Sequence, residues 1–267
     1  MRAALVISLV MLAVLTLVAL AAPLVAPDDP QAVDLSAALS GPTATHFLGA
    51  DGSGRDILSR LVWGARSSLA GPLAVVLLST LIGTAVGVIS GLRGGLTDQV
   101  ISRLNDLAFA FPGLIVAILA VAVFGTGLRA PVIALSIAYT PWIARACRGA
   151  TVVERERPYI AACRIHGMSD LRICLRHILP NVAPVVGAQA SINFGYALID
   201  LAGLSYLGLG VQPPNPDWGV MISEGQGSIT SGAPEEALFA CALVVIAVVA
   251  FNVIADAISD RFLGTAR

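Results

Sequence analysis

The chain has 267 residues, of which 57% are hydrophobic and only 12% are charged, and its formal net charge is −1. The mean hydropathy of +0.85 excludes an ordinary soluble globular domain, so the composition predicts an integral membrane protein. A net charge near zero gives no electrostatic basis for a nucleic-acid partner. The four cysteines show no Cys-x-x-Cys spacing, so neither a disulfide framework nor a metal site is indicated.

The first apolar run, from Ala3 to Val25, is long enough at ~1.5 Å per residue to cross a ~30 Å hydrocarbon core. Residues 1–26 are therefore predicted to be the first membrane span. A cleaved signal peptide is the alternative, because small residues lie near the end of the run, but the apolar part of such a peptide is normally only ~7–15 residues. Residues 27–68 are more polar and form the predicted first external segment.

Residues 69–92 form the predicted second span, in which Gly83, Gly87 and Gly91 recur every four residues. Glycines at this spacing share one helix face and let another helix approach closely, so we expect a packing role, with a pore lining as the less favoured alternative. Residues 93–106 are predicted to be a short polar connection. Within it Arg103 and Asp106 lie one helical turn apart, which predicts a local ion pair.

Four more apolar segments follow, at residues 107–124, at 131–143, from about 182 onward, and at 237–258. Only a tight turn, residues 125–130, separates the third span from the fourth, so these two helices are expected to be antiparallel neighbours. The chain is thus predicted to be an all-α membrane protein with six transmembrane helices, five of them in a core formed by residues 69–267.

An arginine-rich stretch, residues 144–181, interrupts the apolar pattern between the fourth and fifth spans. Pro158 suits the first position of a short helix, and Gly167 suits the position just past its end. Ser169 is placed to cap a second helix that Pro180 ends. The two short helices are expected to form a compact unit. The apolar face of the second helix should hold this unit against the rest of the chain and leave Arg172 and Arg176 for another surface. That face comprises Leu171, Cys174, Leu175 and Ile178.

The spacing in this stretch resembles the cytoplasmic EAA loop of ABC importer permeases. That loop runs Glu-Ala-Ala, three residues, glycine, nine residues, and then a hydrophobic residue, any residue, Leu and Pro. Ala161 stands where the family usually has Glu, and His177 stands at the hydrophobic position. The resemblance implies that the loop docks on an ATP-hydrolysing subunit, whereas the residues alone also fit an ordinary amphipathic loop. The implied coupling residues are Ala161, Ala162, Cys163, Gly167, Ser169, Asp170, Arg172, Arg176, Leu179 and Pro180.

Two other segments restrict the resemblance to one type of permease subunit. Residues 46–66 are similar to the His-Pro-Leu-Gly-Thr-Asp and Gly-Arg-Asp-x-Leu-Ser-Arg signature of the second, C-type permease subunit of dipeptide, oligopeptide and nickel importers. Residues 203–219 resemble the string Gly-Leu-Ser-Phe-Leu-Gly-Leu-Gly-Val-x-Pro-Pro-x-Pro-x-Trp-Gly of the same subunits. The glycines of the first segment do not form a phosphate-binding loop, because no Gly-Lys-Ser/Thr follows; a turn leading into a helix is expected instead.

The arginines predict the orientation in the membrane. With the N-terminus inside, the cytoplasmic segments hold twelve of the sixteen arginines and the external segments hold four. This bias predicts that both termini and the loop at residues 144–181 are cytoplasmic. We therefore expect a multi-pass protein of the bacterial cytoplasmic (inner) membrane.

The resemblance implies a permease subunit of an ATP-driven importer, most simply of dipeptides or oligopeptides, with nickel chelates or other small conjugates as alternatives. Its implied partners are a homologous second permease subunit, two ATPase subunits, an external solute-binding protein and membrane lipid. The chain has no Walker motif and is not expected to be an enzyme or to hold a cofactor; ATP and Mg²⁺ would belong to the partner subunits.

A self-sufficient secondary transporter is less favoured, because the sequence shows no convincing inverted repeat and few charges at the midplane. Asp200 is an ionisable residue within the fifth span and is therefore a candidate for the substrate path. The neighbouring candidates are Ser205 and Tyr206.

Overall fold

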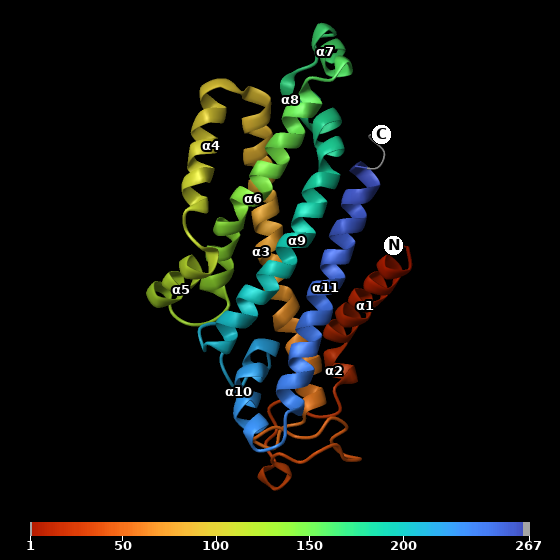
Figure 1. Ribbon diagram of the computed structural model, residues 1–267, viewed down its shortest axis with the longest axis vertical. Helices are drawn as coiled ribbons and strands as arrows, with labels where there is room; N and C mark the ends of the chain where they lie inside the picture. Colours follow the sequence, from red (N-terminus) through yellow and green to blue (C-terminus); the bar gives the residue numbers. More distant parts are fainter. Residues whose placement is uncertain (1, 264–267) are drawn as a thin grey trace.

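The computed structural model describes residues 2–263 as an elongated bundle of α-helices, and within this range the only β-structure is an isolated bridge (Figure 1). Five of these helices are long and apolar enough to cross a membrane. They are α1 (Arg2–Leu20), α3 (Ile57–Arg93), α6 (Arg129–Arg155), α9 (Leu179–Tyr206) and α11 (Glu235–Leu263). A bent pair gives a sixth crossing if it counts as one span: α4 (Gly95–Phe109) and α5 (Gly113–Phe124). The expected all-α membrane fold is confirmed.

Helix α3 lies at the centre of the bundle and packs closely against α6. A Cβ atom added at Gly87 would lie 2.5 Å from the carbonyl oxygen of Ala144, and one at Gly83 would lie 2.6 Å from Cβ of Ile143. The expected packing role of the glycine stripe is therefore confirmed. The same helix begins at Ile57 rather than at residue 69, where Asp56 caps it by accepting a 2.7 Å hydrogen bond from the backbone N–H of Ser59.

The third span is not the single helix that the sequence suggested. The chain bends by 77° between α4 and α5, where Pro112 precedes the first residue of α5. Most of the segment at residues 93–106, which was expected to be a polar connection, is helical and belongs to α4. The chain turns from α3 into α4 at Gly94 and Gly95, which adopt positive φ angles. With only 12 residues, or ~18 Å, α5 is too short to span a bilayer alone.

The predicted ion pair between Arg103 and Asp106 is wrong. Asp106 instead accepts a 2.9 Å hydrogen bond from the guanidinium of Arg145 on α6. The same arginine stacks over Phe109, with its Cζ atom 4.2 Å from the ring centroid. Because Arg145 reaches α4 from a neighbouring helix, it competes successfully with the partner one turn away.

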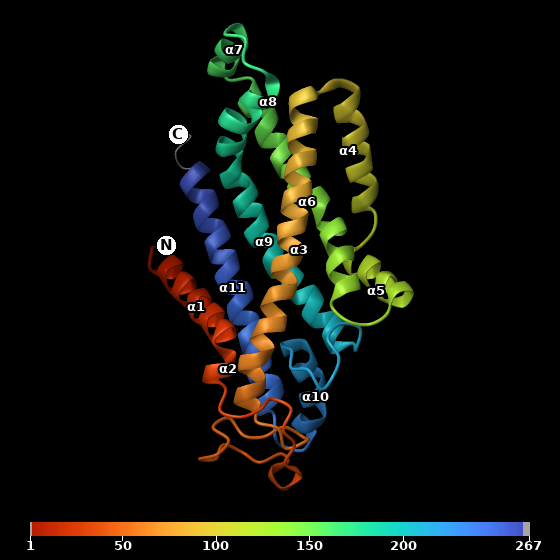
Figure 2. The same ribbon diagram turned by 180° about the vertical axis from the view of Figure 1, so that it is seen from behind.

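One end of the bundle gathers the segment between α1 and α3, the N-terminus of α11, and α10 (Trp218–Thr230), a helix that the sequence analysis missed (Figures 1 and 2). The segment includes α2 (Ala22–Val25) and η1 (Leu35–Ala37). Trp218 is fully buried and donates its indole N–H to the carbonyl of Leu61 at 3.1 Å. Asp217 caps α10 and also accepts a 2.8 Å hydrogen bond from Ser68. We call this the outer end, after the external side on which the arginine bias predicts it to lie.

A small projection marks the opposite end of the bundle (Figure 2). It consists of α7 (Pro158–Ile165), α8 (Asp170–Ile173) and the π-turn η2 (Cys174–Ile178), which runs directly into α9. Since α6 remains helical to Arg155, the non-spanning part of the stretch 144–181 is shorter than expected. The projection therefore sits directly on the ends of two long helices.

Candidate functional site

The first turn of the projection has the geometry that its sequence predicts. Pro158 opens α7, and Gly167 follows its end with φ +75°. The N–H of Gly167 donates to the carbonyl of Arg164 at 2.9 Å, and the N–H of Met168 donates to that of Cys163 at 3.1 Å. These two bonds form a Schellman motif, which fixes the direction in which the chain leaves α7.

The apolar face predicted for the second helix is confirmed at Cys174 and Ile178, which pack in the core, and is wrong at Leu171 and Leu175. Leu171 and Leu175 are 69% and 59% exposed, whereas Ile173 and Ile178 are fully buried with Ile160 of α7. The reason is the π-turn, in which the N–H of Leu179 donates to the carbonyl of Cys174, five residues back. This wider turn aligns residues five apart, so the two isoleucines face the core and the leucines do not.

The sequence suggested that Pro180 ends the second helix, but it does not. It lies in the first turn of α9, and the helical stretch continues from Asp170 to Tyr206. A proline is tolerated in a first helical turn because its missing N–H has no intrahelical partner there. Ser169 does occupy the N-cap position, but its side chain makes no capping hydrogen bond.

The exposed side of the projection combines apolar and positively charged groups. Leu171, Arg172, Leu175 and Arg176 line a shallow hollow of about 500 Å³ together with Ser169. We call these five residues the coupling surface, after the role that the sequence resemblance implies for this loop. Neither of its arginines forms an ion pair with any residue that the structure describes. Of the other sequence-predicted coupling residues, Ala161, Ala162, Asp170 and Pro180 are exposed, and Cys163 and Leu179 are half-buried.

A polar cluster that the sequence analysis missed joins the projection to both supporting helices. The hydroxyl of Tyr159 on α7 donates to Glu154 at the end of α6. The side-chain amide of Asn181 on α9 donates to the same hydroxyl at 3.0 Å and to Glu154 at 3.2 Å. Burial, followed by the hydrogen bond to Glu154, raises the pKa of Tyr159, so the phenol stays neutral. The projection is therefore held to α6 and α9 by hydrogen bonds as well as by its isoleucines.

The three candidate substrate-path residues do not form one site. Asp200 of α9 accepts a 2.7 Å hydrogen bond from the hydroxyl of Tyr139 on α6. Ser205 is buried and accepts a 3.2 Å bond from the N–H of Val211, so it stabilises the turn after α9. Tyr206 donates to Gln226 of α10 at 2.8 Å. Only Asp200 is held by a side chain of another long helix.

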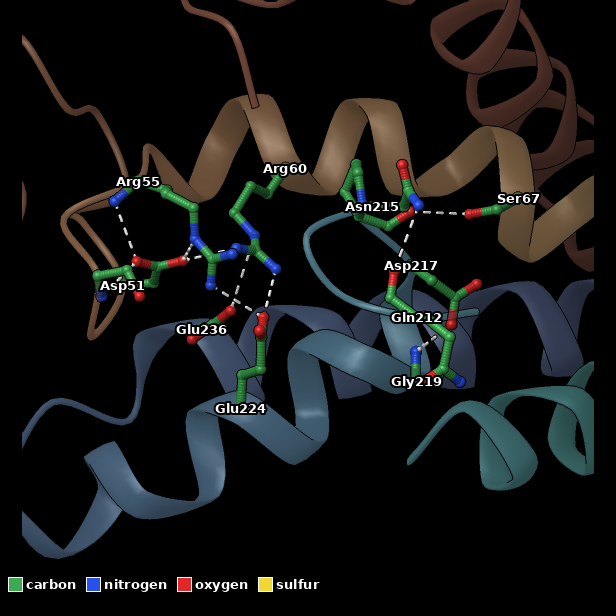
Figure 3. Close-up of polar contacts among 12 residues, drawn as sticks. Asp51, Arg55, Arg60, Ser67, Gln212, Asn215, Asp217, Gly219, Glu224 and Glu236 are labelled. Carbon is green, nitrogen blue, oxygen red and sulfur yellow. Dashed lines mark hydrogen bonds and ion pairs between the residues drawn. The ribbon is translucent and has the colours of Figure 1, made fainter. Parts of the chain in front are cut away.

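The outer end contains a group of five charged side chains, four of them buried and one half-buried, shown in Figure 3. It joins three parts of the chain: the loop before α3 together with its first turn, α10, and α11. We call it the outer ion cluster; its members are Asp51, Arg55, Arg60, Glu224 and Glu236. The carboxylates are widely separated in the sequence, and no sequence signal pointed to a shared site.

A large open cavity of about 910 Å³ lies near the outer end, beside the turn between α5 and α6. Its walls are mostly apolar, and its polar groups include Ser67, Arg129, Gln212 and Asn215. Figure 3 shows Asn215 beside Ser67 of α3. None of the sequence-predicted substrate-path residues lines this cavity.

Among the residues that the structure describes, two groups of side chains place possible metal-ligand atoms within 4.8 Å of one another. The first contains His46, Asp28 and Asp56, and His46 is already 3.2 Å from Asp56. The second lies within the outer ion cluster, where the guanidiniums of Arg55 and Arg60 already bind two of the three carboxylates. The cysteines belong to neither group.

The fold has long apolar helices, a bent span, and a braced projection that joins the ends of two long helices. These features define a multi-pass membrane translocation component, and the comparisons agree with this class. Residues 83–263 match the family described as "Binding-protein-dependent transport system inner membrane component". The chain belongs to this family and is a permease subunit of the ABC importers that comprise peptide, nickel and glutathione systems.

Three similar proteins illustrate the range of this family. A glutathione transport system permease protein GsiD from Pectobacterium atrosepticum is 40% identical, over 82% of this chain and 73% of the relative. A nickel transport system permease protein NikC from Escherichia coli (strain K12) is 36% identical, over 96% and 92%. A dipeptide transport system permease protein DppC from Alkalihalophilus pseudofirmus is 38% identical, over 96% and 84%.

The fold is also similar to that of a solved transporter. The inward-facing methionine ABC transporter MetNI contains a chain that superposes with a TM-score of 0.62 and 22% sequence identity, covering 77% of this chain and 97% of that one. This likeness shows that the fold is that of an ABC importer permease. The family match and the apolar helices make the chain a multi-pass inner-membrane protein.

Proposed function

We propose that this chain is the C-type permease subunit of an importer of dipeptides or oligopeptides, and that its projection receives the motion of an ATP-hydrolysing subunit. The observation that carries the proposal is the construction of the projection. Its buried isoleucines join it firmly to α6 and α9, while two leucines and two arginines face outward, and these arginines have no ion-pair partner among the residues that the structure describes. A partner surface that offers an apolar groove with acidic groups at its rim fits this pattern.

The mechanism follows from how the projection is attached. Because Ile160, Ile173 and Ile178 are fully buried, a force on the coupling surface moves the projection as one unit with the ends of α6 and α9. Packed elements move as rigid bodies with few stable arrangements, so a small displacement tilts both helices. This tilt is the step that changes access to the pore. ATP and Mg²⁺ are assigned to the partner subunits, and no cofactor is assigned to this chain.

The partners follow from this assignment. Two ATPase subunits lie on the cytoplasmic side, a homologous permease subunit completes the pore, and an external solute-binding protein delivers the solute. Both termini are assigned to the cytoplasm, on the side of the projection, in agreement with the arginine bias. Arg267, which contributes to that bias, lies outside the described residues.

The peptide substrate is supported by two of the similar proteins, which are named for dipeptide and glutathione transport, since glutathione is itself a peptide. A nickel relative of similar coverage keeps nickel chelates as the second candidate. Co-expression of the chain with its neighbouring genes, followed by uptake assays in proteoliposomes, tests the choice. Energy-dependent uptake of a labelled dipeptide that excess nickel chelate does not inhibit is the expected result. Uptake of the nickel chelate alone would overturn the peptide assignment.

A further inference from the structure

Glu236 carries a carboxyl group that has no partner for a negative charge. The residue is 2% exposed, and neither carboxyl oxygen has a hydrogen-bond partner among the described residues. Its one ion-pair contact in that part of the chain is Nε of Arg60, which lies 3.9 Å from Oε1 and therefore beyond hydrogen-bonding distance. An ionised carboxylate in this position would be a buried charge with one long ion-pair contact and no hydrogen bond, which proteins avoid.

The positive charges of the outer ion cluster are already neutralised by its other carboxylates. Oδ2 of Asp51 accepts hydrogen bonds from Nε of Arg55 at 2.6 Å and from Nη1 of Arg60 at 2.8 Å. Oε2 of Glu224 accepts from Nη2 of Arg55 at 3.0 Å and also from Arg60. Two guanidiniums thus balance two carboxylates, and Glu236 is the third carboxylate.

The charged groups nearest to Glu236 come from three other parts of the chain. Asp51 and Arg55 belong to the loop before α3, Arg60 to α3 and Glu224 to α10 (Figure 3). One ligand oxygen each of Asp51, Glu224 and Glu236 lies within 4.8 Å of the others. With all five side chains ionised the cluster carries one excess negative charge, so one added positive charge makes it neutral.

A proton supplies this charge better than a metal ion does. A metal ion requires several free oxygen ligands and would lie beside two guanidiniums that repel it. A proton requires only one oxygen. We propose that the outer ion cluster binds one proton, which Glu236 carries as a carboxylic acid next to the Glu224 carboxylate.

Release of this proton would leave three negatively charged carboxylates beside only two positively charged guanidiniums. The repulsion falls on the contact between the first turn of α11 and α10, so proton loss loosens the outer end. The sign of the pH effect follows from linkage. An unfolded glutamate titrates near pH ~4.3, so above that pH the folded chain holds a proton that the unfolded chain does not. Stability therefore falls as pH rises, until Glu236 ionises in the folded state.

Infrared spectroscopy of the full-length chain, purified in detergent with any subunits that accompany it, tests the proposal directly. The wild type is expected to show a protonated-carboxyl C=O band that disappears at alkaline pH, and Glu236→Gln is expected to lack it at every pH. Glu235→Gln is the matched control, because it removes the neighbouring carboxyl and should leave the band unchanged. The melting temperature should fall less steeply with rising pH in Glu236→Gln than in the wild type or the control.

Two results would overturn the proposal. The first is an identical carboxyl band in the wild type and in Glu236→Gln, which would show that Glu236 is ionised. The second is a rise in the melting temperature of the wild type, but not of Glu236→Gln, on addition of Ca²⁺, which would show that the cluster holds a metal ion. If Glu236→Gln does not fold, Glu236→Asp decides the question instead, because a band that belongs to this residue changes its frequency with the side chain, and an unchanged band would overturn the proposal. Neither measurement depends on transport, so the outcome is independent of the proposed function.

Discussion

Arg148 of α6 holds Asp98 of α4 with two guanidinium nitrogens, and the bond from Nη2 to Oδ2 is 2.6 Å long. The hydroxyl of Ser90 on α3 donates to the same carboxylate. A single aspartate therefore joins three helices at the end of the bundle that carries the projection. Because α4 has no fully buried residue, this ion pair and that between Arg145 and Asp106 attach it to α6.

The first prediction concerns this attachment. Arg148→Lys keeps the charge but loses the paired geometry, and since Arg148 is 38% exposed the expected loss of stability is modest, ~1 kcal/mol. Arg103→Lys is the control, because Arg103 is exposed and forms no ion pair among the described residues. Thermal unfolding in detergent measures both. Equal melting temperatures for the two variants would show that the ion pair contributes nothing.

The second prediction concerns the contact between α3 and α6. Gly87→Ala places a methyl group 2.5 Å from the carbonyl oxygen of Ala144, so the helices must separate at an expected cost of ~1–3 kcal/mol. Gly149→Ala on α6 is the matched control, since no atom lies within 4 Å of its new methyl group and alanine favours the helix. A lower melting temperature is expected only for Gly87→Ala. Loss of stability in both variants would contradict the close-packing account.

The third prediction separates the supporting side of the projection from its exposed side. Ile173→Ala removes a fully buried side chain and should cost ~2–4 kcal/mol of stability. Leu175→Ala removes a side chain that is 59% exposed and should leave the melting temperature nearly unchanged. We expect Leu175→Ala to weaken binding of the ATPase subunits, measured by the fraction that copurifies. A loss of stability in Leu175→Ala but not in Ile173→Ala would contradict this account and would support the apolar face that the sequence suggested.

The fourth prediction concerns the cap of α10. Burial raises the pKa of Asp217, although hydrogen bonds from the hydroxyl of Ser68 and the backbone N–H of Gly219 oppose this shift. A raised folded pKa means that ionisation opposes folding, so this group's contribution falls as pH rises from ~4 toward its folded pKa. Asp217→Asn should flatten that part of the pH profile of the melting temperature. Asp217→Ala also loses the cap and should cost ~1–2 kcal/mol at every pH.

Much of the fold was predictable from local patterns. The long apolar runs predicted the spans, the glycine repeat predicted the contact of α3 with α6, and Pro158 with Gly167 predicted both ends of α7. Each of these signals lies within a few residues and needs no knowledge of distant parts of the chain. The family resemblance rested on similarly local strings, and the comparisons confirm it.

The errors have a common physical cause, which is competition from distant residues or unusual helical turns. Asp106 pairs with Arg145, 39 positions away, rather than with Arg103. The π-turn before Pro180 changes which residues share a face, and a period of 3.6 residues does not reveal it. The outer ion cluster joins residues more than 160 positions apart, such as Arg60 and Glu224, so no local pattern identifies it.

The most direct test of the central claim is copurification of the chain with the ATPase encoded by its neighbouring genes, after Arg172 and Arg176 are both changed to Glu. The control changes Arg66 and Arg129 to Glu, which alters the net charge equally on exposed residues away from the projection. The account predicts that the ATPase is lost from the first variant and retained by the control. Full retention by the first variant, with unchanged ATPase-driven uptake, would contradict the assignment of the projection as the coupling element.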